Sequence, residues 1–327
     1  MLWNRSFFDA VFGRVMCAVA ACALCAPAAA QGYPEKPIKL IVGFAPGGSI
    51  DVAARIMAQK MSEGFGRSVI VENRSGAGGV IASSYVAKAE PDGHTLLLIG
   101  GYFTIQPAFQ KLPFNPVQDF SFISMLARFP LVMLVRTDDR RFGTLAEFIA
   151  YARRNPGKIN FPAAVGSIHH FTGEMLNAMA GIDMTTVPSR SGADLMTEVI
   201  SGRQDMLFND ILTSNPHIRA GTVRPIAVTS PQSSPLVPNV PPVAQSVPGF
   251  EVRTYIGMVA PAGIPSAIVE QLHREVGRIL DLPDIRQRFG EWGGDTGPVS
   301  PEDMRRFVIG EIAKWQRLMK ERKMEMK

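Results

Sequence analysis

The amino-acid sequence predicts an α/β fold in which strands and helices alternate along the chain, and three observations support this. Apolar runs typical of buried parallel strands recur from residue 38 to residue 228. Helical patterns with recognisable starts and ends lie between them. The chain has 327 residues, of which 46% are hydrophobic, and can form two domains, since one domain usually takes roughly 100–200 residues.

The elements follow one another with clear boundary signals. Thr144 and Glu147 form a predicted capping box before a helix, and Ser300 is the predicted N-cap of a last helix with Pro301 at its first position. This alternation implies parallel sheets with helices on both faces, in which ligands bind beyond the carboxyl ends of the strands. The predicted strands are residues 38–42, 69–72, 95–99, 131–135, 184–187, 206–208 and 225–228.

The N-terminal 30 residues have the pattern of a secretory signal peptide. Arg5 and Arg14 precede an apolar, alanine-rich run over residues 15–30 that ends in Ala-Ala-Ala. A membrane anchor needs about 20 apolar residues, and this run is shorter, so we expect it to be removed and the protein to be exported to the periplasm. All three cysteines lie in this segment, so we expect no disulfide in the mature chain. Lipid anchoring through Cys25 is a weaker alternative, because Cys22 stands where a lipobox usually has leucine.

The charge balance is mildly basic. The chain has 34 Lys and Arg residues and 29 Asp and Glu residues, and removal of Arg5, Arg14 and Asp9 leaves 32 against 28, a net charge of +4. These charges are interspersed along helices, and the sequence has no long basic run. We therefore expect no nucleic-acid partner.

The stretch FAPGGSIDVAARIMAQ, residues 44–59, predicts a strand end, a tight glycine turn and a helix with Ser49 as its N-cap. Gly47 and Gly48 carry no Cβ, so a ligand can approach the backbone closely there. A helix N-terminus has unsatisfied N–H groups and a partial positive charge, so we expect an anion, most simply a carboxylate or phosphate. The dinucleotide fingerprint and the P-loop spacing are absent, which disfavours a nucleotide. The alternative is that the two glycines merely shape a tight connection.

Two further strand-to-helix turns have the same character. In NFPAAVGSIHHFTGEML, Ser167 is the predicted N-cap, and His169 and His170 fall in the first turn. In VPSRSGADLM, Arg190 precedes a helix that starts near Gly192, and its forked guanidinium suits a carboxylate. Together the three turns predict one ligand held between two lobes.

Segments that carry a family resemblance are spread over the chain from about Tyr33 to Trp315. They read YPEKPIKLIVGFAPGGSIDVAARIMAQKM, VIVENRSGAGGVIASSYVAKAEPDGHTLLL, NPGKINF, GEMLNAMAGIDMTTVP, PHIRAGTVRPIAVTS and MVAPAGIPSAIVEQL. In these segments the chain resembles the tripartite tricarboxylate transporter substrate-binding family, the Bug or TctC-like periplasmic receptors. The resemblance implies a two-lobed periplasmic-binding-protein fold of the Venus-flytrap kind, type II-like, with two hinge crossings and a small carboxylate in the cleft. The expected division is a signal peptide over residues 1–30, a first lobe over 31–130 plus 257–327, and a second lobe over 131–256.

The resemblance also implies a set of ligand contacts. In the family, the first glycine loop holds the ligand's carboxylate partly through ordered waters. That loop corresponds here to Phe44, Ala45, Pro46, Gly47, Gly48, Ser49 and Asp51. The loop of the second lobe corresponds to Gly166, Ser167, Ile168, His169 and His170. The remaining expected contacts are Gly100, Gly101, Tyr102, Ser189, Arg190, Asn209 and Asp210.

Several of these residues depart from the family's pattern. Ile168 and His169 replace small polar residues, and Arg190 replaces a lysine. The usual Phe-Asp-Asn reads Phe-Asn-Asp, so that Asn209 and Asp210 are exchanged. The departures cluster at the cleft and therefore bear on the identity of the ligand, not on the fold.

We expect a monomeric, non-enzymatic receptor without a cofactor that delivers a mono- or dicarboxylate to integral-membrane permease subunits. The alternative is a ligand sensor whose partner is a periplasmic sensor kinase. His169, His170 and Asp210 could form a metal site, but adjacent histidines point different ways on a helix, which favours capping and ligand contact. A hydrolase with Ser49 or Ser167 as nucleophile would need a G-x-S-x-G elbow or a triad order, and the sequence shows neither.

Overall fold

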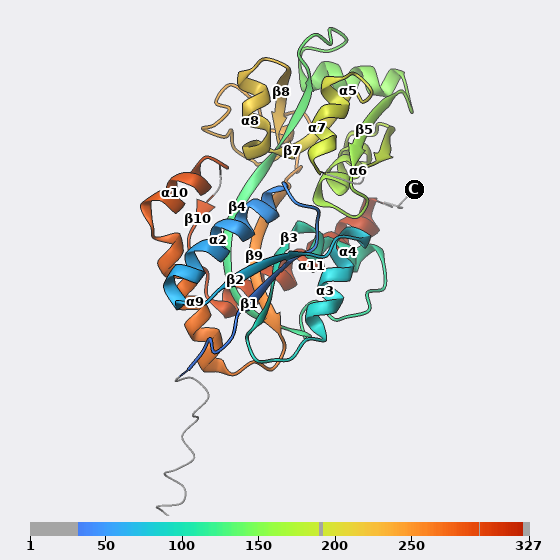
Figure 1. The fold of residues 1–327 in the computed structure, drawn as a ribbon. Coiled ribbons are helices and arrows are strands. Elements are labelled where there is room, and N and C mark those ends of the chain that lie inside the picture. Colours follow the sequence, from blue (N-terminus) through green and yellow to red (C-terminus); the bar gives the residue numbers. More distant parts are fainter. Residues whose placement is uncertain (1–31, 190–191, 294, 323–327) are drawn as a thin grey trace, which may run out of the picture.

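The structure is a computed structural model that describes residues 32–189, 192–293 and 295–322. The predicted signal peptide and Arg190 lie outside these residues. The elements form two groups, one above the other in Figure 1, and the long strand β4 (Phe120–Arg136) runs from the lower group into the upper one. We call the lower group the first lobe and the upper group the second lobe. Within the described ranges, no helix is long and apolar enough to cross a membrane.

The order of the elements follows the predicted alternation. The strands are β1 (Ile38–Val42), β2 (Val69–Asn73), β3 (Thr95–Gly100), β4, β5 (Ile159–Ala163), β6 (Met184–Pro188), β7 (Met206–Asp210), β8 (Val223–Val228), β9 (Arg253–Pro261) and β10 (Asp295–Thr296). The α-helices are α2 (Ser49–Phe65), α3 (Val80–Ala87), α4 (Gly101–Phe109), α5 (Leu145–Arg154), α6 (Ile168–Ala180), α7 (Gly192–Ile200), α8 (Ile211–Arg219), α9 (Ser266–Leu280), α10 (Pro283–Gly290) and α11 (Pro301–Arg322). The described residues also include the short 3₁₀ helices η2 (Ala77–Gly79) and η3 (Val243–Gln245).

The sheet of the first lobe has the strand order β10-β4-β9-β3-β1-β2. β1 pairs in parallel with β2 and β3, as the alternation of strands and helices predicts. β9, however, runs antiparallel to both β3 and β4. The predicted parallel arrangement is therefore wrong for part of the sheet, because β9 brings the chain back from the second lobe and runs against the strands beside it.

In the second lobe, β4 continues as a shared strand with new partners. Pro130 lies opposite Arg253 of β9, whereas Leu131 lies opposite Asp210 of β7. β7 and β8 both pair antiparallel with β4, and β5 and β6 form a separate parallel pair. The strand predicted at residues 131–135 is thus only the second-lobe part of a strand of 17 residues.

The two chain segments that cross between the lobes are held together by Thr229, which is fully buried. Its backbone N–H donates to the Leu131 carbonyl oxygen at 2.9 Å, and its hydroxyl oxygen accepts the Leu131 N–H at 2.8 Å. The same hydroxyl donates to the carbonyl oxygen of Val252 at 2.6 Å. Residue 131 is on the outgoing segment and residue 252 on the returning one, so Thr229 fixes the two crossings side by side.

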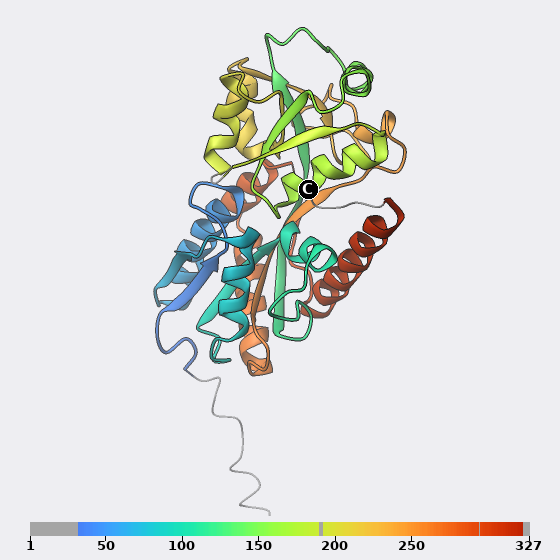
Figure 2. The same cartoon turned by 90° about the vertical axis from the view of Figure 1, so that its right-hand side faces the viewer.

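Each lobe has its own apolar core. In the first lobe, α2 and α9 cover one face of the sheet with buried side chains such as Met57 and Leu272. α3, α4 and α11 cover the other face, where Met304 is buried. Further along α11, Trp315 packs instead into the second-lobe core with Phe171. Figure 2 shows α11 along one side of the molecule, where it contributes to both lobes.

The predicted helix starts at Thr144 and Ser300 are confirmed. The Thr144 hydroxyl accepts the Glu147 N–H, and the Glu147 carboxylate accepts the Thr144 N–H, which completes the capping box. The Ser300 hydroxyl accepts the N–H of Asp303 at 3.1 Å, and α11 begins at Pro301. These caps depend only on neighbouring residues, so the sequence is enough to predict them.

Candidate ligand-binding site

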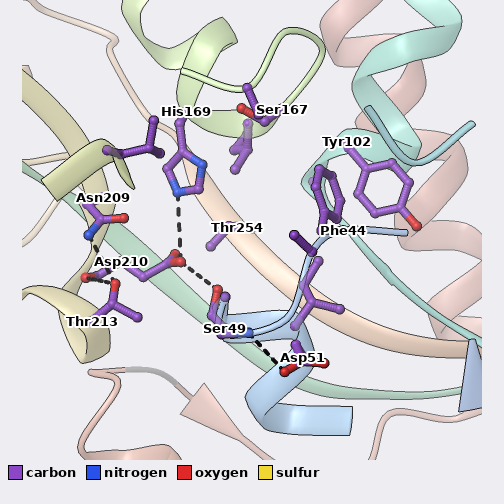
Figure 3. A pocket seen from close by; sticks show the side chains of 18 of the residues that line it. Phe44, Ser49, Asp51, Tyr102, Ser167, His169, Asn209, Asp210, Thr213 and Thr254 are labelled. Atoms are coloured by element: carbon purple, nitrogen blue, oxygen red, sulfur yellow. Dashed lines mark hydrogen bonds and ion pairs between the residues drawn. The ribbon is translucent and has the colours of Figure 1, made fainter. Parts of the chain in front are cut away.

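A cavity of about 300 Å³ lies between the two lobes. The ends of β1, β3 and β7 and the starts of α2, α4, α6 and α8 meet there, so the cavity has walls from both lobes (Figure 3). It is lined by Phe44, Ala45, Gly47, Gly48, Ser49, Ile50, Asp51, Gly101, Tyr102, Phe129, Ala164, Ser167, Ile168, His169, Leu195, Met196, Asn209, Asp210, Thr213, His217 and Thr254. The first two predicted strand-to-helix turns therefore contribute to one shared space, and Leu195 and Met196 of α7, the helix after the third turn, also line it.

The glycine turn before α2 owes its shape to Asp51. Gly47 adopts a left-handed φ of 94°, which a residue with a side chain rarely takes, and its N–H donates to Asp51 Oδ2 at 3.0 Å. Arg55 donates to both oxygens of the same carboxylate, and Asn73 donates to Oδ1. Burial raises the pKa of Asp51, but the hydrogen bonds from Arg55, Gly47 and Asn73 outweigh it and lower the pKa overall. Asp51 is thus a buried, paired carboxylate that braces the turn.

Ser49 is not the N-cap of α2, which corrects the sequence prediction. The N-cap is Gly48, with an extended backbone and no side-chain capping bond. The Ser49 hydroxyl instead donates to Asp210 Oδ2 at 2.5 Å, across the cavity and 161 residues away (Figure 3). Ser49 is already the first residue of the helix, so its side chain is not at the N-cap position, and its hydroxyl makes a charge-assisted hydrogen bond between the lobes.

The loop before α6 places its two histidines differently. Ser167 is the N-cap, and its hydroxyl accepts the His170 N–H at 3.3 Å, as predicted. The N–H of Gly166 donates to His170 Nδ1, so the buried His170 ring braces the loop. Burial lowers the pKa of His170, and the nearby Glu174 carboxylate only partly opposes this shift. His169 turns into the cavity, where its Nε2 lies 3.7 Å from Asp210 Oδ2.

At the start of α8, Asn209 and Asp210 have separate roles. Asn209 Nδ2 donates to the hydroxyls of Thr213 at 3.0 Å and Ser214 at 3.1 Å, so it braces the first turn of the helix. Asp210 is the N-cap residue by its backbone, yet its side chain makes no capping bond. Its carboxylate points into the cavity instead, toward Ser49 and His169 (Figure 3).

The rest of the cavity wall is largely apolar. Phe44 and Tyr102 meet edge to face with ring centroids 5.1 Å apart, and Ile168, Leu195 and Met196 extend this surface. The Tyr102 hydroxyl donates to the Leu98 carbonyl oxygen at 3.3 Å, and burial raises the pKa of this hydroxyl. Among the described residues, the cavity wall contains neither lysine nor arginine.

The structure brings most of the residues expected at the site together on this wall, and leaves others off it. Pro46, Gly100, Gly166, His170 and Ser189 are not part of the lining, and Arg190 lies outside the described residues. Sequence reasoning missed Ile50, Phe129, Ala164, Leu195, Met196, Thr213, His217 and Thr254. Ile50 directly follows the turn that ends at Ser49, and Thr213 lies in the first turn of α8, three residues after the end of β7. Phe129 and Thr254 lie on the crossing strands β4 and β9, and no local motif marks them.

The metal-site alternative finds limited support in the geometry. His170 is held by its own loop, and only His169 approaches Asp210. In the described part of the chain, no group of three or more His, Cys, Asp and Glu residues is placed to hold a metal ion.

Comparisons with known proteins agree with this arrangement. Residues 53–324 match the profile of the family described as "Tripartite tricarboxylate transporter family receptor". The chain is similar to the solved structure of R. palustris Rpa4515 with adipate, with 32% identity, a TM-score of 0.83, and coverage of 88% of this chain and 97% of that chain. It is also similar to MatC (Rpa3494) from Rhodopseudomonas palustris with bound malate, with 30% identity, a TM-score of 0.82, and coverage of 88% and 99%. A third similar structure is the periplasmic binding protein BugD, with 31% identity, a TM-score of 0.84, and coverage of 90% and 100%. The expected two-lobed fold is confirmed.

Proposed function

Because this chain belongs to the tripartite tricarboxylate transporter receptor family, we propose that it is a solute-binding receptor that captures a small carboxylate between its lobes. It binds its ligand without chemical turnover and delivers it to integral-membrane permease subunits. It acts in the periplasm after removal of the first 30 residues, in keeping with the description of the similar BugD as a periplasmic binding protein.

The observation that carries this proposal is the meeting of helix starts from both lobes at one cavity. α2, α4 and α8 have no side-chain cap, so the N–H groups of their first turns are available to a ligand. These ends also carry the positive pole of the helix dipole, which favours a carboxylate. The similar structures with adipate and malate hold ligands of this chemical class.

The lobes move as two bodies around the crossing at Thr229. We place their boundaries where the partners of β4 change, after Pro130 and before Arg253, close to the division that the sequence suggested. Gln106 Nε2 of α4 donates to the carbonyl oxygen of Gly78 in its own lobe at 2.7 Å and to that of Gly166 in the other lobe at 3.4 Å. A ligand that touches both walls favours the arrangement in which the contact between Gln106 and Gly166 forms.

Binding to purified mature protein tests the receptor role directly. Isothermal titration and thermal unfolding are measured with short mono- and dicarboxylates, and with amines and neutral sugars of matched size. At least one carboxylate is expected to bind and to raise the unfolding temperature, as ligand linkage requires. Binding of amines or sugars together with no binding of any compound that carries a carboxylate contradicts the proposal. Mass spectrometry of ligand retained through purification identifies the natural compound.

Delivery to a permease is tested in cells. Deletion of the gene is expected to abolish uptake of the labelled ligand at low concentration, and a copy with the signal segment is expected to restore it. A copy that starts at residue 32 lacks that segment and is expected to leave uptake abolished. Uptake that continues unchanged in the deletion strain contradicts the transport role.

A further inference from the structure

The most distinctive group in the cavity is the carboxylate of Asp210. Its residue is only 4% exposed, and the side chain points into the space between the lobes (Figure 3). Both of its side-chain contacts fall on Oδ2, namely the hydrogen bond from Ser49 and the approach of His169. Within the part of the chain that the structure describes, Oδ1 has no hydrogen-bond partner. One acceptor oxygen therefore remains available in the cavity.

Among the described residues, no lysine or arginine on the cavity wall balances the negative charge of this carboxylate. His169 Nε2 is 3.7 Å from Oδ2, which is too long for a hydrogen bond, and this buried nitrogen has no hydrogen-bond partner among the described residues. An imidazole adds positive charge only when it is protonated. The contrast with Asp51 is clear, since Arg55 donates to both oxygens of that carboxylate.

A buried carboxylate without a cationic partner disfavours a second negative charge beside it and favours a positive one. If one carboxylate of a dicarboxylate binds at the helix starts, its second carboxylate lies in the same cavity beside Asp210. A ligand with one carboxylate and one ammonium group avoids this repulsion. Its carboxylate binds at the helix starts, while its ammonium donates to Oδ1 of Asp210.

We propose that the ligand of this receptor is an amino-carboxylate, whose protonated amino group pairs with Asp210. This inference rests on the proposed receptor function and narrows it to a chemical class. The apolar wall adds a second feature. Phe44, Tyr102, Ile168 and Leu195 contact the hydrocarbon or aromatic body of the ligand, which lies between its two polar ends.

The exchange of asparagine and aspartate in the Phe-Asn-Asp stretch gives this site its charge. The Asn209 amide donates to the hydroxyls of Thr213 and Ser214, so it braces the first turn of α8 and brings no charge to the cavity. The acid falls one position later, on the residue that points at the cavity. The opposite order would place a neutral amide there.

Two matched triplets of compounds test the proposal on the unaltered protein. One is 3-phenylpropanoate, 3-phenyllactate and phenylalanine, and the other is hexanoate, 6-hydroxyhexanoate and 6-aminohexanoate. Within each triplet the members share a carboxylate and a carbon frame, and differ in a hydrogen, a hydroxyl or an ammonium group. In at least one triplet the ammonium member is expected to bind about tenfold more tightly than the other two, as a charge-assisted hydrogen bond allows.

The variant Asp210→Asn adds a reversal of sign. It is expected to weaken binding of the ammonium compound by about tenfold and to strengthen binding of adipate. The reason is that asparagine lacks the negative charge of Asp210 but keeps the shape of its side chain. The matched control is Asp138→Asn, which removes the same charge from a side chain that is 75% exposed and paired with Arg136 on the surface. The control is expected to leave both affinities within about twofold. Thermal unfolding confirms that each variant is folded.

The outcomes separate this inference from the receptor function itself. If carboxylates bind but no ammonium compound binds more tightly than its parent and its hydroxyl analogue, the amino-carboxylate proposal is overturned and the receptor proposal stands. The proposal is also overturned if folded Asp210→Asn protein changes its affinity for the ammonium compound and its affinity for adipate in the same direction. If no compound with a carboxylate binds, with or without an ammonium group, the receptor proposal fails and this inference fails with it.

Discussion

Replacement of Gly48 by valine tests whether a ligand approaches the backbone at the start of α2. Gly48 has φ of −80° and ψ of 167°, a conformation open to β-branched residues. A Cβ at this position meets no heavy atom within 4 Å. The folded protein therefore accepts the new side chain, and the main cost is a poorer N-cap residue, about 1 kcal/mol. For a protein of this size, that loss lowers the unfolding temperature by roughly 2–4 °C.

The effect of Gly48→Val on binding is expected to be much larger. Valine adds three carbon atoms, and at about 30 Å³ each, the share of volume of one water molecule, they fill roughly 90 Å³. Gly48 lies on the wall of a cavity of about 300 Å³, so the added side chain takes up space that a ligand needs beside the helix start. We expect affinity to fall at least about 100-fold, which corresponds to about 2.7 kcal/mol.

The assay is isothermal titration with the ligand retained through purification, combined with thermal unfolding of both proteins. Gly290→Val is the matched control, because Gly290 ends α10 on the surface and a Cβ there also meets nothing within 4 Å. The control is expected to bind the ligand normally. Unchanged affinity in Gly48→Val, or an equal loss in Gly290→Val, would refute the placement of the ligand at this turn.

Three further predictions concern the turn, the contact between the lobes and a distant helix cap. The pKa of Asp51 is lowered in the folded state, because the hydrogen bonds to its carboxylate outweigh the effect of burial. The ionised carboxylate therefore stabilises the fold above the unfolded-state pKa near 3.8, and this stabilisation is lost as the pH falls below that value. Urea unfolding should therefore show a smaller loss of stability from about pH 6 to about pH 3 in Asp51→Asn than in the unaltered protein, and equal losses would contradict this. Ser49→Ala removes a hydrogen bond to the Asp210 carboxylate, which is worth roughly 1.5–3 kcal/mol, so titration should show weaker ligand binding. Unaltered affinity would mean that this contact does not help the lobes close. Thr144→Ala removes the cap of α5 and should lower the free energy of unfolding in urea by about 1 kcal/mol, with no change in ligand affinity. A change in affinity would show that this helix is coupled to the site.

The elements of the fold follow from local patterns, but the pairing of its strands does not. Periodicity and capping residues locate most strands and helices, because these signals act over a few residues. The direction of β9 depends on where the chain leaves and re-enters the first lobe, as β4 and β9 run in opposite senses between the lobes. The strand predicted at residues 131–135 ends short for the same reason. Only the structure shows that β4 continues beyond its first-lobe partner and pairs again with β7.

The candidate site divides in a similar way. Gly47, Gly48 and Ser167 could be predicted because a turn followed by a helix is a local signal, and all three line the cavity. The partner of Ser49 could not, since Asp210 lies 161 positions away in the sequence and only the fold brings the two side chains together. Phe129 and Thr254 belong to the wall because β4 and β9 pass behind it, and nothing in their neighbours indicates this.

A receptor of this kind needs a fixed hinge and weaker contacts elsewhere between its lobes, and the hydrogen bonds of this chain differ in length in that way. At the hinge, Thr229 is fully buried and joins the outgoing and returning segments through three bonds of 2.6–2.9 Å. Between the lobes, Gln106 reaches Gly166 at 3.4 Å, close to the limit of a hydrogen bond. The contact from Ser49 is short, but it depends on a carboxylate that faces the cavity. A ligand that binds this carboxylate and the helix starts together acts on both lobes at once, and so it can shift their equilibrium by its difference in affinity for the two arrangements.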